Sequence, residues 1–141
     1  MKEIRKKIYI LDTSALLSYI EDEEGSDIVE NLLIEAENKK IVIWIAFVSL
    51  TEVFYITLQE KGETEAKKRL ELMQSLAINI EESNEDLNLR AARFKAKNCI
   101  SLADAYIAAL CEKYNGILVH KDPEFKSVSP AIKEYRLPYK K

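Results

Sequence analysis

The order of apolar segments along the chain constrains its fold more than any other feature. Short apolar runs rich in β-branched residues alternate with longer segments whose apolar residues recur at helical spacing. The expected strands are 8–11, 41–45, 77–80 and 117–119, with an edge strand near 135–137, and the expected helices are 14–20, a second ending near 39, 49–61, 63–75, 84–97 and 101–114. Strands that alternate with helices predict an α/β fold with a central, mainly parallel sheet flanked by helices.

The size and composition of the chain are typical of a single domain covering residues 1–141. With 141 residues and 48% hydrophobic content, the chain is long enough to bury one core. Its longest strongly apolar stretch, 41–50, is far too short to span a bilayer, and Asp12 interrupts the apolar run 8–11 before it reaches the length of a signal sequence. We therefore expect a cytoplasmic protein with no membrane segment.

The supply of cysteine, histidine and basic residues excludes some function classes. Cys99, Cys111 and His120 are the only cysteines and the only histidine, too few for a His/Cys zinc site. We expect Cys111 to fill the core and Cys99 to be a plain thiol near a helix end. The net charge of −3 is unlike the basic excess of most nucleic-acid binders, but an acidic nuclease can gather its cations around the cleft.

Four acids lie where expected parallel strands have their carboxyl ends, the edge of an open α/β sheet at which functional residues gather. These acids, here called the acidic quartet, are Asp12 after the first strand, Glu52 in the helix after the second, Asp104 at the start of an apolar helix, and Asp122 past the strand 117–119. Clustered carboxylates repel one another unless a cation neutralises them, and an all-oxygen ligand set favours Mg²⁺ or Mn²⁺. The acidic quartet thus predicts a metal site suited to phosphodiester hydrolysis.

Each member of the acidic quartet also has a structural explanation as a helix cap. Glu52 and Asp104 stand three residues after a serine, the spacing of a capping box, and Asp122 precedes a proline in the manner of an N-cap. Asp12 is equally suited to cap the first helix. Taken singly, capping is the commoner role for Glu52, Asp104 and Asp122, whereas the coincidence of four acids favours a site. Both interpretations remain open.

Taken together, four blocks of the sequence resemble the PIN-domain family, and in particular its VapC-like toxin ribonucleases. The blocks are ILDTSALL at 10–17, SLTEV at 49–53, SLADAYIAA at 101–109 and LVHKDPEF at 118–125. Each block alone is weak evidence, but the ordered set is specific and runs through both ends and the middle of the chain. The resemblance implies a three-layer PIN-like fold and an Mg²⁺- or Mn²⁺-dependent endoribonuclease acting on single-stranded RNA.

The resemblance also assigns roles to individual residues. The acidic quartet matches the family's acidic residues, with Asp12 and Asp104 expected to hold the principal metal ion and Glu52 and Asp122 to complete the site. Ser14 matches the polar residue that orients the first aspartate or its bound water. His120 departs from the threonine or serine more usual two residues before the last acid, which weakens Asp122 most. We favour a structural role for His120 over a contact to substrate.

Residues that bind RNA are harder to choose. Arg90, Arg93 and Lys97 share one helical face, and Lys121 flanks Asp122, but charged faces are usually only solvated. Aromatic residues for base stacking, such as Tyr55 or Tyr106, cannot be selected from sequence.

The helix 49–61 is apolar nearly all round, which indicates either a self-association surface or deep burial in the monomer. The resemblance implies a homodimer and a cognate antitoxin as partners. Haloacid-dehalogenase-like phosphatases and receiver domains fit poorly, because the former need a second acid where Ser14 stands and the latter need an acidic pair where Tyr9 and Ile10 stand. The alternative that remains is a catalytically silent PIN-like module that binds RNA or protein.

Overall fold

The computed structural model describes residues 5–121, 125 and 132–138, in which strands and helices alternate as predicted. The strands are β1 (Lys7–Leu11), β2 (Ile41–Ala46), β3 (Asn79–Glu81), β4 (Ile117–His120) and β5 (Lys133–Arg136). The helices are α1 (Thr13–Ile20), α2 (Ser26–Glu37), α3 (Phe47–Lys61), α4 (Glu63–Ser75), α5 (Glu85–Lys97) and α6 (Leu102–Tyr114). These strands form one parallel sheet in the order β3-β2-β1-β4-β5, which confirms the predicted fold class.

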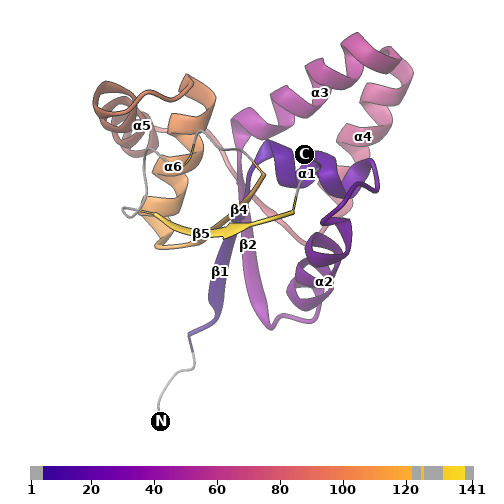
Figure 1. Cartoon of the computed structure of the whole chain (residues 1–141), viewed down its shortest axis with the longest axis horizontal. Coiled ribbons are helices and arrows are strands. Elements are labelled where there is room, and N and C mark those ends of the chain that lie inside the picture. The colour runs from indigo at the N-terminus through magenta and orange to yellow at the C-terminus, as the bar shows by residue number, and fades with distance from the viewer. Residues whose placement is uncertain (1–4, 122–124, 126–131, 139–141) are drawn as a thin grey trace.

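Helices cover both faces of the sheet, giving three layers (Figure 1). Successive residues of a strand point to opposite faces, so neighbouring residues of β1 enter different cores. Ile10 packs in a cluster with Leu87 of α5 and Ile107 of α6 on one face. Leu11 packs on the other face in a cluster that includes Leu16 of α1. Burial on both sides accounts for the continuously apolar sequence of the central strands.

The hairpin of α3 and α4 extends beyond the sheet (Figure 1) and is tied to α1 by a buried arginine. Arg69 of α4 is 6% exposed. Its guanidinium donates to Glu21 Oε1 at 3.0 Å, just past the end of α1, and to Thr57 Oγ1 of α3 at 3.2 Å. Because a buried charge is costly unless it is paired, this contact fixes the hairpin relative to α1.

The carboxyl ends of the strands meet at one edge of the sheet. Leu11 at the end of β1 is level with Val119 of β4, and Ala46 at the end of β2 is level with Glu81 of β3. The segments that follow β1 and β2 turn at once into α1 and α3. This edge therefore gathers the residues that stand immediately after the strands, as the sequence predicts.

Some boundaries differ from the prediction in ways that matter for the site. α3 begins at Phe47, two residues before the expected start, and β3 spans Asn79–Glu81 instead of 77–80. α6 ends at a left-handed Asn115 (φ 50°), not at the predicted Gly116. Gly116 is needed for a different reason: a Cβ at this position would lie 2.9 Å from Ile10 Cγ1, too close for a side chain to fit. In the part of the chain that the structure describes, none of the helices is sufficiently long and apolar to cross a membrane.

Candidate active site

Asp12 is held in the turn between β1 and α1. Its side chain is 2% exposed and caps α1, with Oδ1 accepting from the Ala15 N–H at 2.9 Å. Ser14 Oγ donates to the same oxygen at 2.7 Å and accepts from the backbone N–H of Lys121 at 2.9 Å. This relay links the end of β4 to Asp12 through Ser14. Asp12 thus has the predicted capping role, and Ser14 contacts it as predicted.

Glu52 lies in the second turn of α3 and does not form the capping box suggested by the sequence. α3 starts earlier than expected, its N-cap is Ala46, and no side chain caps it. Thr13 Oγ1 lies 2.6 Å from Glu52 Oε1 and 3.2 Å from Ser49 Oγ. A hydroxyl has one proton, so we assign that of Thr13 to the carboxylate and that of the buried Ser49 to Thr13. The capping interpretation of Ser49 and Glu52 is therefore wrong.

Asp104 stands in the first turn of α6, whose N-terminus points to the same edge. Ser101 caps this helix by accepting from the Asp104 N–H at 3.1 Å, as the capping box predicts. The Asp104 side chain is buried, and it shares a helical stripe with Cys111 seven residues on. Burial raises the pKa of the Cys111 thiol, and the negative charges of Asp12 and Glu134 raise it further. The charge of Asp12 therefore acts electrostatically on this side of α6.

Asp122 lies outside the described residues, so its place in the acidic quartet stays a prediction. Within residues 5–121, 125 and 132–138, no three Asp, Glu, His or Cys side chains form a ready ligand group for a metal ion. The donor chemistry nevertheless fits Mg²⁺, which is commonly held by one or two carboxylates together with water and substrate phosphates. Asp12 and Asp104, both buried, are the carboxylates that would serve in this way.

Comparison with known families identifies the kind of domain to which this site belongs. A family model described as the PIN domain matches residues 9–129 of the 141-residue chain. The chain belongs to the PIN-domain family. The matched range includes Ser14 and all four members of the acidic quartet. A comparison with curated proteins finds no match.

Solved structures share the fold of this PIN domain over nearly its whole length. VapBC2 from Rickettsia felis, solved with a DNA fragment from its promoter, aligns with a TM-score of 0.74 at 20% identity, covering 93% of this chain and 99% of the other. VapBC from Salmonella typhimurium, solved with DNA, gives 0.73 at 16% identity and covers 94% and 98%. VapC20 from Mycobacterium tuberculosis, a toxin that cleaves the sarcin-ricin loop, gives 0.70 at 17% identity and covers 92% and 99%. At these identities the likeness establishes the fold.

The basic residues of this PIN domain that could bind RNA differ in how close they lie to the acidic quartet. Arg90 is engaged by Asp86 at 3.0 Å and by Glu112 at 2.9 Å, so it braces α5 against α6. Arg93 and Lys97 border a hollow that Glu112 of α6 also lines, and no acid of the quartet lines it among the described residues. Lys121 is close to the acids, because its backbone N–H binds Ser14. The structure therefore favours Lys121 over the face of α5 as a phosphate contact.

His120 and the two cysteines occupy the positions expected of structural residues. His120 is 2% exposed, its ring lies edge-on to Phe125 at 5.0 Å between centroids, and its Nε2 is 3.4 Å from Glu134 Oε1. A side chain buried in this way favours the structural interpretation. Cys111 is buried in the core and Cys99 is an exposed free thiol after α5, as expected.

Sequence reasoning missed Thr13 and Glu81. Thr13 orients Glu52, a role for which only its place between Asp12 and Ser14 gave a hint. Glu81 is a buried acid at the end of β3, bonded by Lys113 and by Tyr114 Oη at 2.8 Å. Burial raises the pKa of Glu81, but these hydrogen bonds and one from Asn84 outweigh it and hold the pKa below its ordinary value. The available signal was that Glu81 directly follows the predicted strand 77–80.

Proposed function

We propose that this PIN domain is a metal-dependent endoribonuclease that hydrolyses phosphodiester bonds of single-stranded RNA. The observation that carries the proposal is the pair of hydroxyl relays that hold Asp12 and Glu52 at the carboxyl edge of the sheet. Supporting hydrogen bonds of this kind keep reactive side chains in one geometry before substrate arrives. Membership of the PIN family supports the same assignment.

Each acid has a distinct task in the proposed site. Mg²⁺ or Mn²⁺, when bound, supplies activation of water and neutralisation of charge on the phosphate. Asp12 and Asp104 hold the principal ion, and Glu52 and Asp122 complete the site. Ser14 fixes one oxygen of Asp12, and Thr13 does the same for Glu52, so neither carboxylate has to be ordered during the reaction. Asp104 lies in the first turn of α6, where the partial positive charge of the helix N-terminus attracts a carboxylate.

We also infer that the protein is the toxin of a toxin–antitoxin pair. The structures that share its fold include a toxin–antitoxin complex from Klebsiella pneumoniae and VapBC-5 from Mycobacterium tuberculosis, a member of the VapBC family of toxin–antitoxin systems. A cognate antitoxin is thus the proposed protein partner. Co-expression with the product of the neighbouring gene, followed by purification through a tag on one chain, tests this: a stable complex without RNase activity is expected, and separate elution of the two chains contradicts it.

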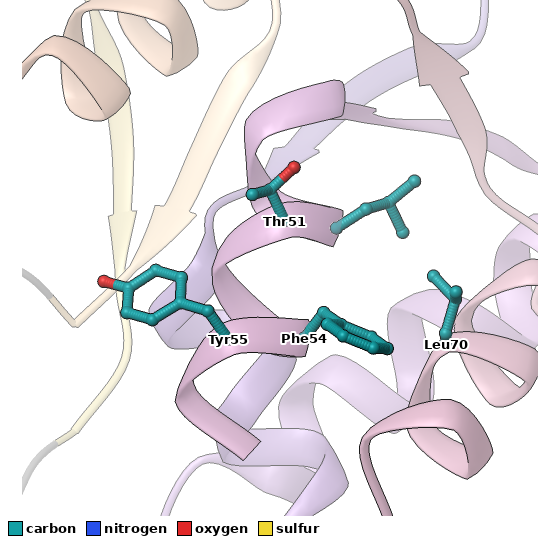
Figure 2. Close-up of a pocket in the computed structure, with 5 residues that line it drawn as sticks. Thr51, Phe54, Tyr55 and Leu70 are labelled. Carbon is teal, nitrogen blue, oxygen red and sulfur yellow. The ribbon is translucent and has the colours of Figure 1, made fainter. Parts of the chain in front are cut away.

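A homodimer is the second proposed assembly, formed through the side of α3 that faces α4. Figure 2 shows Phe54 of α3 and Leu70 of α4 turned toward one another, whereas Tyr55 points to the other side of α3. The hollow that they line with Leu50 and Thr51 has a volume of about 380 Å³. Leu58, one turn beyond Phe54 on α3, is 42% exposed. Sedimentation of the parent and of Leu58→Asp tests the proposal, with a dimer expected only for the parent.

Cleavage of RNA tests the enzymatic proposal directly. Purified protein is incubated with unstructured and structured RNAs in Mg²⁺, in Mn²⁺ and in EDTA, beside the double variant Asp12→Asn/Asp104→Asn. Cleavage of the unstructured RNA that requires metal and is lost in the double variant is expected. Cleavage that persists in the double variant contradicts the site.

A metal titration separates the enzyme from a catalytically silent PIN module. Thermal unfolding is followed as Mn²⁺ is added, because a ligand that binds only the folded state raises Tm. The parent is expected to gain stability and the double variant to gain none. Equal responses of the two proteins favour the silent module.

A further inference from the structure

A second hollow, of about 530 Å³, lies beside the one proposed for dimerisation and shares residues of α3 with it. Its walls are the first turns of α3 and α6, with Ser83 from the segment after β3. The lining residues are Phe47, Val48, Thr51, Glu52, Tyr55, Ser83, Leu102, Ala103 and Tyr106. Thr51 and Tyr55 border both hollows and form the ridge between them.

Two aromatic rings inside this hollow are held in a fixed arrangement. Phe47 and Tyr106 meet edge to face, with centroids 5.0 Å apart and an angle of 79° between the rings. Tyr106 Oη donates to Asn88 Oδ1 of α5 at 2.8 Å, which anchors the ring from outside. Both side chains are only half-buried, so part of their ring surface borders the hollow. A rigid aromatic wall is a surface on which a flat ring can stack at small entropic cost.

The hollow is continuous with the candidate active site. Glu52, a member of the acidic quartet, forms part of its wall, and Ala103 directly precedes Asp104 on α6. Leu102, 58% exposed, stands at its border. A strand whose phosphate reached Asp12 and Asp104 would therefore bring an adjacent nucleotide to this hollow.

We propose that this hollow binds one unstacked nucleobase of the RNA strand, which packs on the wall formed by Phe47 and Tyr106. The inference rests on the proposed function, because it takes RNA as the substrate. Single-stranded RNA is commonly recognised by bases splayed onto aromatic side chains, and such stacking tolerates any base. Among the lining residues that the structure describes, Glu52 alone is charged, which suits an uncharged ring and disfavours an acidic peptide.

Fluorescence of a base analogue tests the subsite without requiring cleavage. Short single-stranded RNAs carrying 2-aminopurine at successive positions are titrated with protein in EDTA, because stacking on a ring quenches this fluorophore. Tyr106→Leu removes the ring but keeps apolar bulk, and Tyr106→Phe keeps the ring but loses the bond to Asn88. Tyr135→Ala is the matched control, since Tyr135 is also exposed but lies on β5, at the opposite edge of the sheet from β3.

The expected result is quenching at one position, with the Kd raised about 10-fold in Tyr106→Leu, equivalent to about 1.4 kcal/mol. Tyr106→Phe and Tyr135→Ala should bind as the parent does, and the dependence on salt should not change, because no charge is altered. Equal quenching and affinity in Tyr106→Leu and the parent, or no quenching in any protein, overturn the proposal. So does a change in oligomeric state in Tyr106→Leu without a change in RNA affinity, since a second copy would then occupy the hollow.

The same proteins separate this inference from the proposed function. If Tyr106→Leu loses quenching but the parent cleaves no RNA, the subsite stands and the nuclease assignment fails. If the parent cleaves RNA and Tyr106→Leu leaves both Kd and KM unchanged, the nuclease assignment stands and the subsite fails.

Discussion

Two kinds of acid lie at the carboxyl edge of the same sheet, and they are stabilised in opposite ways. Glu81, at the end of β3, is bonded by the ammonium of Lys113, the hydroxyl of Tyr114 and the amide of Asn84. Glu52 accepts a hydrogen bond from a hydroxyl. Oδ1 of Asp12 accepts one from a hydroxyl and one from a backbone N–H. One arrangement neutralises a carboxylate, and the other orients it.

This difference separates a structural acid from a candidate ligand. A lysine bonded to a carboxylate already provides the cation that the acid needs, and removing it would leave a buried charge. Hydroxyl donors fix the geometry of a carboxylate without cancelling its charge, so the carboxylate can still attract a metal ion. Position at a strand end is shared by both groups. The chemistry of the donors is what sets them apart.

The largest contrast should come from removing one acid of each kind and measuring turnover. Asp12→Asn should lower kcat/KM for RNA cleavage by more than about 100-fold, because even residues that only support a metal ligand are worth 10- to 100-fold. Glu81→Gln should leave activity per folded molecule unchanged, since the bonds of Glu81 run to Lys113, Tyr114 and Asn84. Equal loss of activity in the two variants would show that the donors do not distinguish the groups.

Stability should respond in the reverse order. Glu81→Gln leaves Lys113 facing a neutral amide at a site where the acid side chain is only 9% exposed. The free energy of unfolding should fall by about 2 kcal/mol, the usual scale for hydrogen bonds to charged groups. Urea unfolding followed by circular dichroism measures this change. Asp12→Asn should cost less, because its amide oxygen can still accept from Ala15.

The sequence predicted the sheet and the place of the site better than it predicted the donors. The alternation of strands and helices along the chain was enough to predict an α/β fold. The strands could be recognised because burial on both faces gives a continuously apolar sequence. Asp12 was found because it directly follows β1. The partner of Glu52 was missed because Thr13 and Glu52 are 39 residues apart in the sequence, and only tertiary packing brings them together. Glu81 directly follows the predicted strand 77–80, so its position could have been noticed, but its partners Lys113 and Tyr114 lie 32 and 33 residues away and are found only from the structure.

A smaller effect should follow from weakening one relay while keeping its acid. Ser14→Ala removes the hydroxyl that joins Lys121 to Asp12. Cleavage should fall about 10-fold, with a matching loss in the affinity for Mn²⁺, as is typical when a supporting hydrogen bond to a ligand is removed. Ser75→Ala is the control, since that hydroxyl is exposed and bonds only within α4. Activity equal to the parent in Ser14→Ala would mean that Asp12 does not need Ser14 to hold its geometry.

The smallest expected effect is on the difference in stability between the parent and Glu81→Gln, which should depend on pH. Because the pKa of Glu81 is lowered from 4.5 in the folded protein, the unfolded chain takes up this proton first as the pH falls. The stabilisation from Glu81 is therefore complete at neutral pH and decreases as the pH falls below about 4.5 toward the folded-state pKa. Urea midpoints of the parent and of Glu81→Gln, measured at pH 7 and pH 3, should differ less at the lower value. A constant gap would mean that Glu81 stabilises β3 through packing and not through its charge.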